Sequence, residues 1–102
     1  MLALRPNCEL CDKDLPPTST DAMICSYECT FCRDCVEGVL SNVCPNCGGG
    51  FAPRPIRPAK AWRASTGLQN HPASPKRVHA KYSEKELWEF SASLSRIDPA
   101  DR

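Results

Sequence analysis

The apolar residues near the C-terminal end of the chain follow a helical pattern. They recur at spacings of three, four and three residues: Leu87, Phe90, Leu94 and Ile97. Ser83 and Glu86 flank the start of this stripe in the spacing of a capping box. Asp98 and Pro99 then stop the pattern. The sequence therefore predicts an amphipathic helix over about 84–96, and a helix this short needs a surface to pack against.

A shorter pattern of the same kind lies at residues 33–42. Its apolar members are again three or four residues apart or adjacent: Val36, Val39, Leu40 and Val43. Gly38 weakens the helix that they predict. Residues 22–26 contain Met23 and Ile24 and predict a short strand. Together these patterns predict a small α+β fold.

Residues 52–82 show neither a helical nor a strand period. Five prolines interrupt this stretch, among basic and small residues: Pro53, Pro55, Pro58, Pro72 and Pro75. Such a composition is typical of an extended or disordered linker. We therefore expect three parts, a compact module at 1–51, a basic proline-rich linker at 52–82 and an amphipathic helix at 83–97.

The chemistry of the compact module is set by its cysteines. Eight cysteines lie within residues 8–47 and none lies outside: Cys8, Cys11, Cys25, Cys29, Cys32, Cys35, Cys44 and Cys47. They form closely spaced pairs, which present two sulfurs to one metal ion from a single turn. Eight thiolates are the number that two tetrahedral four-cysteine zinc sites require. We therefore expect two structural Zn²⁺ ions as cofactors.

Disulfides and iron–sulfur ligation are the alternatives to zinc. Disulfides belong to oxidising compartments, and the N-terminal residues 1–8 show no long apolar run of a secretory signal. No other stretch approaches the roughly 18 apolar residues of a membrane span. These observations favour zinc and a cytoplasmic location. The few large apolar residues of the module also imply that the metal-free protein is largely unfolded there.

The charge is divided between the two halves of the chain. Residues 1–50 carry three basic and seven acidic residues, and residues 51–82 carry seven basic and no acidic ones. The overall net charge of +1 hides this division. An acidic module is a poor surface for phosphates, so any nucleic-acid contact would come from the tail.

The eight ligands can pair in two ways. Sequential pairing joins the first four cysteines and then the last four, whereas interleaved pairing joins the first and third pairs and the second and fourth. Both give two all-thiolate tetrahedra, so metal chemistry alone leaves the choice open.

The pattern of residues 8–47 resembles a RING-type cross-brace finger in its all-cysteine form. Leu10, Phe31 and Pro45 occupy the apolar positions of such fingers, and Cys29 stands where most have histidine. LIM modules share the central cysteine run, but the gap before Cys44 is short for a second LIM finger. The resemblance implies interleaved sites. The first would be Cys8, Cys11, Cys32 and Cys35, and the second Cys25, Cys29, Cys44 and Cys47.

Residues 1–58 also resemble a small bacterial family of cysteine-rich proteins of unknown function. The resemblance rests on the cysteine spacing between Leu4-Arg5-Pro6-Asn7-Cys8 and Cys44-Pro45-Asn46-Cys47-Gly48-Gly49. It implies a RING-like zinc fold and supplies no activity, and residues 59–102 lie outside it.

The favoured function is a non-enzymatic adapter that binds a protein partner. The candidate contacts are the stripe Leu87, Phe90, Leu94 and Ile97. The RING resemblance implies further partner contacts at Leu10, Val39, Leu40 and Pro45, and turn packing is the alternative for Leu10 and Pro45. The alternative for the stripe is packing on the module itself. The RING resemblance implies a ubiquitin ligase, but Gly48 replaces the basic residue usual after the last ligand.

Nucleic-acid association is a third hypothesis. The residues that would contact phosphates and bases are Arg54, Arg57, Lys60, Trp62, Arg63, Lys76 and Arg77. The alternative is that this basic run is a solvated linker. An enzyme is the least supported class, because two filled four-cysteine sites leave no open coordination position. His71 and His79 also lie far in sequence from the cysteines.

Overall fold

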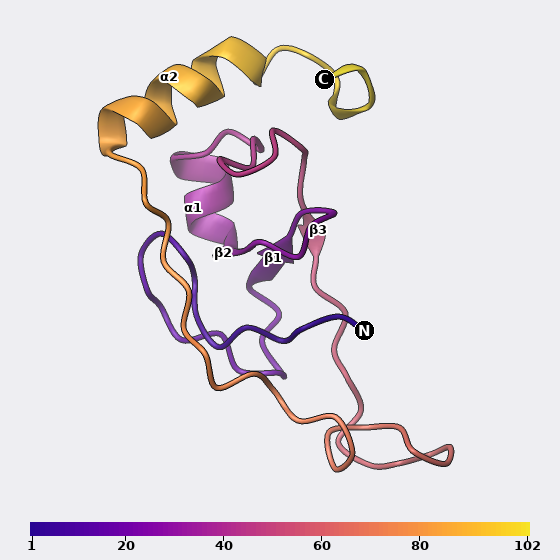
Figure 1. Ribbon diagram of the computed structural model, residues 1–102. Coiled ribbons are helices and arrows are strands. Elements are labelled where there is room, and N and C mark those ends of the chain that lie inside the picture. The colour runs from indigo at the N-terminus through magenta and orange to yellow at the C-terminus, as the bar shows by residue number, and fades with distance from the viewer.

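The structure is a computed structural model that describes residues 1–102. Three short strands form one antiparallel sheet in the order β2-β1-β3. A short helix lies between the second and third strands in the chain, and a longer helix lies near the C-terminus (Figure 1). The elements are β1 (Ala22–Ile24), β2 (Thr30–Cys32), α1 (Arg33–Gly38), β3 (Ala52–Pro53), α2 (Glu84–Leu94) and the 3₁₀ turn η1 (Pro99–Asp101). The predicted small α+β fold is confirmed.

The core lies between the sheet, α1 and the N-terminal turn. Met23 of β1 pairs with Phe31 of β2, and the Phe31 ring meets the edge of Phe51 at a centroid distance of 5.5 Å. Six of the thirteen residues in the buried cluster are cysteines. A core with so few hydrocarbon side chains provides little stability without a metal.

Helix α1 is shorter than the apolar pattern predicts. It ends at Gly38, because Ser41 and Asn42 adopt left-handed backbone angles with φ of 50° and 59°. Leu40 N–H instead donates to the carbonyl of Cys35, and Asn42 N–H donates to that of Val36. This turn reverses the chain and directs it toward the last cysteine pair.

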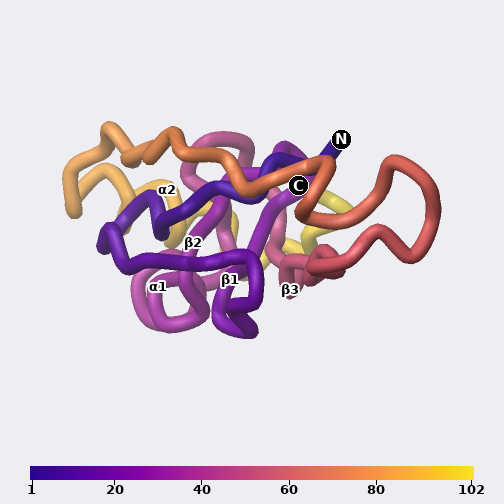
Figure 2. The backbone as a smooth tube through the Cα atoms, turned by 90° about the horizontal axis from the view of Figure 1, so that it is seen from below, coloured from indigo at the N-terminus to yellow at the C-terminus, as the bar shows by residue number.

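The tail runs from one end of the molecule to the other. After β3 it descends away from α2, turns back, and returns beside the N-terminal segment (Figures 1 and 2). Ser74 N–H donates to the Leu4 carbonyl at 3.0 Å, and the Asn7 amide donates to the Val78 carbonyl at 2.8 Å. Beyond β3, residues 54–82 form no helix or strand. The disorder expected from their composition stays a prediction.

Helix α2 begins at the predicted capping box. Ser83 Oγ accepts from Glu86 N–H, and the Glu86 carboxylate accepts from Ser83 N–H, each at 3.2 Å. Its buried face packs on the turn after α1, where Ser91 Oγ donates to the Leu40 carbonyl at 3.0 Å. Leu87 is buried in the core cluster.

No helix of the protein is both long and apolar enough to cross a membrane.

We expect Leu87→Ala to detach α2 from the module. Leu87 is 3% exposed, and truncating a buried leucine costs about 2–5 kcal/mol, whereas α2 alone is too short to persist in water. Hydrogen exchange should then become fast at the α2 amides and stay slow in the sheet. Trp88→Ala, at an exposed position of the same helix, serves as the control and should leave protection unchanged. Equal protection of α2 in both variants would contradict the packing described above.

Candidate metal centres

Four cysteines come together from three parts of the chain to form the first candidate centre. Their Sγ atoms all lie within 4.8 Å of one another: Cys8, Cys11, Cys32 and Cys35. Two lie on the N-terminal turn, one ends β2 and one lies in the first turn of α1. The sulfurs of Cys11 and Cys32 are 3.7 Å apart. Sulfurs bound tetrahedrally to one zinc ion are about 3.8 Å apart, given Zn–S bonds of about 2.3 Å, so the donor set fits zinc.

The second candidate centre lies between β1 and the turn that follows α1. The Sγ atoms of Cys25, Cys44 and Cys47 lie within 4.8 Å of one another. Cys29, the fourth predicted ligand, is buried but falls outside this group at that limit. Its sulfur accepts a hydrogen bond at 3.4 Å from the Asn46 side chain, which lies between two of the other ligands in sequence. Cys29 therefore borders the second group, and its role as a ligand stays a prediction.

The two groups interleave along the chain. The first unites the first and third cysteine pairs, and the second unites the fourth pair with Cys25. The β1–β2 hairpin connects the two groups, because Cys25 directly follows β1 and Cys32 ends β2. This is the cross-brace arrangement implied by the RING resemblance. The two groups make the protein a candidate metal-binding protein.

Backbone and side-chain N–H groups surround the sulfurs. Cys11 N–H donates to Cys8 Sγ at 3.5 Å, and Tyr27 N–H donates to Cys25 Sγ at 3.3 Å. Gly49 N–H donates to Cys47 Sγ at 3.4 Å. Such hydrogen bonds orient ligands and stabilise thiolate charge. Gly48, which follows the last cysteine, has a φ of 80°, a left-handed conformation that glycine adopts without strain.

The environment of the thiols opposes ionisation in the absence of a cation. Burial raises the pKa of Cys35 and Cys44 far above the ordinary thiol value, and neighbouring cysteines raise it further. Burial also opposes ionisation of Cys11, but hydrogen bonds from the Lys13 backbone and from Cys8 and Cys32 outweigh it, so its pKa is lowered. Four thiolates this close together need a positive ion between them. Metal binding at either group therefore requires the release of protons.

Two of the four module positions that the RING resemblance assigns to a partner are buried. Leu40 and Pro45 are buried, Leu10 is half-buried against the core, and Val39 is exposed. A Cβ at Gly48 would lie 3.1 Å from Leu94 Cδ1, and φ is 80° there, so a basic side chain after the last ligand would strain the backbone and displace Leu94. Of the four positions, only Val39 is thus exposed, and it lies beside α2.

The four candidate contacts of the apolar stripe, three on α2 and Ile97 beyond its end, differ in their exposure. Leu87 is buried, Leu94 is half-buried against Gly48, and Phe90 and Ile97 are each 39% exposed. The inner part of the stripe thus packs on the module.

Three of the tail residues predicted to contact nucleic acid instead bind the module. Arg54 donates to the carbonyls of Arg5, Leu15 and Pro16, and Arg57 donates to those of Leu2 and His71. These partners lie between 14 and 55 positions apart in sequence. Arg77 forms ion pairs of 2.8 Å with Asp12 and Asp14. Hydrogen bonds from Arg77 and then His79 lower the pKa of Asp12. The other four, Lys60, Trp62, Arg63 and Lys76, are exposed.

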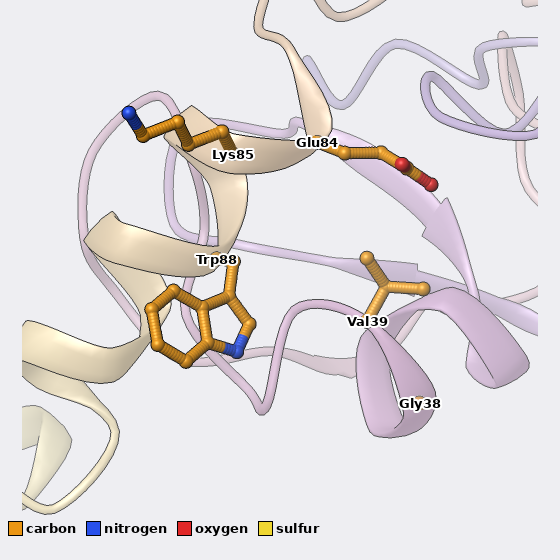
Figure 3. A pocket seen from close by; sticks show the side chains of 5 residues that line it. All are labelled: Gly38, Val39, Glu84, Lys85 and Trp88. Carbon is orange, nitrogen blue, oxygen red and sulfur yellow. The ribbon is translucent and has the colours of Figure 1, made fainter.

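The structure adds a groove between α1 and α2 that the sequence did not predict. Its volume is about 420 Å³, and five residues line it: Gly38, Val39, Glu84, Lys85 and Trp88 (Figure 3). The Trp88 ring extends along the groove toward α1, and the Lys85 amine points away from it. In the sequence, Trp88 lies at the edge of the apolar stripe, and this position was the one signal that could have indicated the groove.

Comparison with known proteins places the chain in a family. Residues 1–57 match the family described as "Protein of unknown function (DUF1272)". An uncharacterized protein of Rhizobium meliloti (strain 1021) is 58% identical over 78 residues, which cover 76% of this chain and 86% of that protein. A continuous stretch of 78 residues leaves 24 of the 102 outside it, so it includes residues 25–78 wherever it begins. No solved structure matches the chain. The family match spans more than half of the sequence, and the protein belongs to the DUF1272 family.

Proposed function

We propose that the protein is a non-enzymatic adapter in which two four-cysteine zinc sites hold a binding surface in shape. The composition of the two cysteine groups supports a structural role for the metal. A zinc ion bound by four thiolates has no open position for a water or a substrate. The histidines that could act on a thiol are engaged elsewhere, His71 with the Ser65 carbonyl and His79 with Asp12.

The observation that carries the proposal is the groove between α1 and α2. Val39 is 45% exposed and Trp88 is 70% exposed, and they face one another from two separate helices. Exposed apolar side chains that converge in a groove are typical of protein interaction sites. The buried Leu87 and the hydrogen bond from Ser91 to the Leu40 carbonyl fix the spacing of the two helices.

The electrostatics of the groove favour a particular kind of protein segment. Glu84 extends its carboxylate over Val39, while the Lys85 amine lies outside and approaches Glu89 at 3.9 Å. Asp34 and Glu37 of α1 are exposed nearby in sequence. The partner is therefore a segment that inserts an apolar side chain between Val39 and Trp88 and carries basic residues beside it.

The proposal is tested by site-specific photo-crosslinking in cells that naturally make the protein. A crosslinking residue at position 88 should give a discrete product, and one at Ser93, which is exposed on another face of α2, should not. Adding Val39→Asp to the position-88 variant should abolish the product, because an aspartate places a hydrated carboxylate in the apolar wall against which the partner's side chain packs. Identical products from positions 88 and 93, or a product that survives Val39→Asp, would contradict a protein site in this groove.

A further inference from the structure

A compact loop closes on itself at the end of the molecule opposite α2, and we call residues 58–71 the distal loop (Figure 1). Leu68 N–H donates to the Pro58 carbonyl at 2.8 Å and joins its two sides. Within it, Thr66 Oγ donates to the Arg63 carbonyl at 2.7 Å, and His71 N–H donates to the Gly67 carbonyl at 2.9 Å. The distal loop is thus held by its own hydrogen bonds, as in compact Ω-loops.

Gly67 fixes the shape of the distal loop. It is buried and has a φ of 81°, a left-handed conformation that glycine adopts without strain. A Cβ at this position would lie 2.5 Å from the backbone oxygen of Lys60. The close approach of these two backbone segments sets the direction in which residues 60–63 project.

The distal loop presents an aromatic ring among positive charges. Trp62 is 75% exposed, the Lys60 ammonium lies 6.0 Å from the centre of a Trp62 ring, and Arg63 is exposed beside them. Residues 52–82 contain no acidic side chain. A cation near the face of a tryptophan is held by the ring's quadrupole, so Lys60 and Trp62 form one surface.

The structure separates this surface from the rest of the basic tail. The guanidinium groups of Arg54 and Arg57 donate to carbonyls of the module, and that of Arg77 pairs with its carboxylates. Lys60 and Arg63 form no ion pair and make no side-chain hydrogen bond to the module. The matched stretch of the Rhizobium meliloti protein includes the whole distal loop, since it covers residues 25–78.

We propose that the distal loop binds single-stranded nucleic acid. One base stacks on the exposed face of Trp62, and Lys60 and Arg63 contact the neighbouring phosphates. Stacking on an aromatic side chain together with backbone charge is the usual chemistry of single-strand binding. A duplex offers no free base face to a single loop tryptophan, and an acidic peptide offers charge without a ring to stack. This site lies at the other end of the molecule from the groove and does not depend on the proposed protein partner.

The test is fluorescence anisotropy of a labelled twelve-residue oligothymidine titrated with full-length, zinc-loaded protein. Trp62→Ala should weaken binding about tenfold, since one stacked base contributes about 1–3 kcal/mol. Trp88→Ala is the matched control, because Trp88 is similarly exposed but lies on an acidic helix, and it should change binding less than twofold. Lys60→Ala combined with Arg63→Ala should reduce the slope of log K against log salt by about 1.4. The corresponding control is Lys85→Ala.

A second readout follows the two tryptophans separately. Oligothymidine should quench the emission of the Trp88→Ala protein, in which Trp62 and its stacked base remain, and should leave that of the Trp62→Ala protein unchanged. Gly67→Ala should weaken binding as much as Trp62→Ala while zinc content and the circular dichroism of the module stay the same.

Several outcomes would overturn the proposal. These are absence of saturable binding by the wild-type protein, equal loss in Trp62→Ala and Trp88→Ala, tighter binding of a duplex of the same length, or equal competition by polyglutamate. Val39→Asp, which disables the groove, should leave oligothymidine binding intact, so failure of either site is distinguishable from failure of the other.

Discussion

Chelation of the metal is expected to unfold residues 1–51. Each structural zinc contributes on the order of 10 kcal/mol of apparent binding energy, which is folding energy where the site is absent from the unfolded chain. The buried cluster cannot replace it, because six of its thirteen residues are cysteines. Burial raises the pKa of Cys35 and Cys44, so without a metal ion these two thiols stay protonated, and nothing draws the cysteines of either group together. We expect the far-UV circular dichroism of the sheet and α1 to collapse on chelation.

The measurement is native mass spectrometry before and after chelation, with a thiol count under denaturing conditions. We expect two zinc ions per chain and eight reactive thiols once the protein is denatured. Cys44→Ser, in the second centre, and Cys11→Ser, in the first, should each lower the zinc count by one. A metal-free protein eight hydrogens lighter would instead contain four disulfides. A chelated protein that keeps a cooperative thermal transition would also contradict a metal-dependent fold.

The same zinc measurement also tests whether Cys29 is a ligand of the second centre. Cys29 borders its group, and Asn46 donates to the Cys29 sulfur. If Cys29 is the fourth ligand, Cys29→Ser should weaken the second zinc as strongly as Cys44→Ser does. Asn46→Ala removes only the hydrogen bond and serves as the control. An unchanged affinity in Cys29→Ser would leave the second ion with three cysteine ligands.

The apolar patterns were enough to predict the small α+β fold class, and the short-range cysteine pairs define where each ligand turn lies. Local signals also predicted the start of α2, where Ser83 and Glu86 form hydrogen bonds with one another. These features depend on neighbours in sequence. The choice between interleaved and sequential groups depends on how β1 and β2 pair, which is why only a resemblance favoured one of them.

The tail could not be predicted in the same way. Its composition indicates a linker, but the contacts of Arg54 and Arg77 join residues 38 to 65 positions apart, and no periodic pattern encodes them. When an arginine donates to backbone carbonyls, its partners carry no acidic side chain, so the sequence does not indicate which residues it binds. The groove was missed for a similar reason, since it exists only where α2 crosses the end of α1. Long-range hydrogen bonds of single side chains are thus the part of this fold that sequence reasoning does not reach.

Arg54→Met is expected to destabilise the metal-loaded protein by about 3 kcal/mol. Arg54 is 4% exposed, and burial lowers the pKa of its guanidinium. Its two terminal nitrogens donate to the carbonyls of Arg5, Leu15 and Pro16 at 2.8, 3.1 and 3.0 Å, with no carboxylate involved. Methionine fills similar space but leaves these acceptors without partners, and each unsatisfied buried group costs about 1–3 kcal/mol. Water that reaches some of these carbonyls lowers the cost, so we expect a loss of unfolding free energy near the lower end of the sum for three carbonyls.

Urea unfolding at saturating zinc measures this cost directly, and hydrogen exchange shows where it falls. Arg54→Lys keeps the charge but loses the planar fork that reaches three carbonyls, so it should recover only part of the stability. Arg63→Ala, in the exposed part of the tail, should change the free energy of unfolding by less than about 0.5 kcal/mol. Exchange should rise first in residues 1–16, whose carbonyls Arg54 binds. If Arg54→Met is no more destabilising than Arg63→Ala, the tail does not hold the N-terminal segment, and the module owes its stability to the metal sites alone.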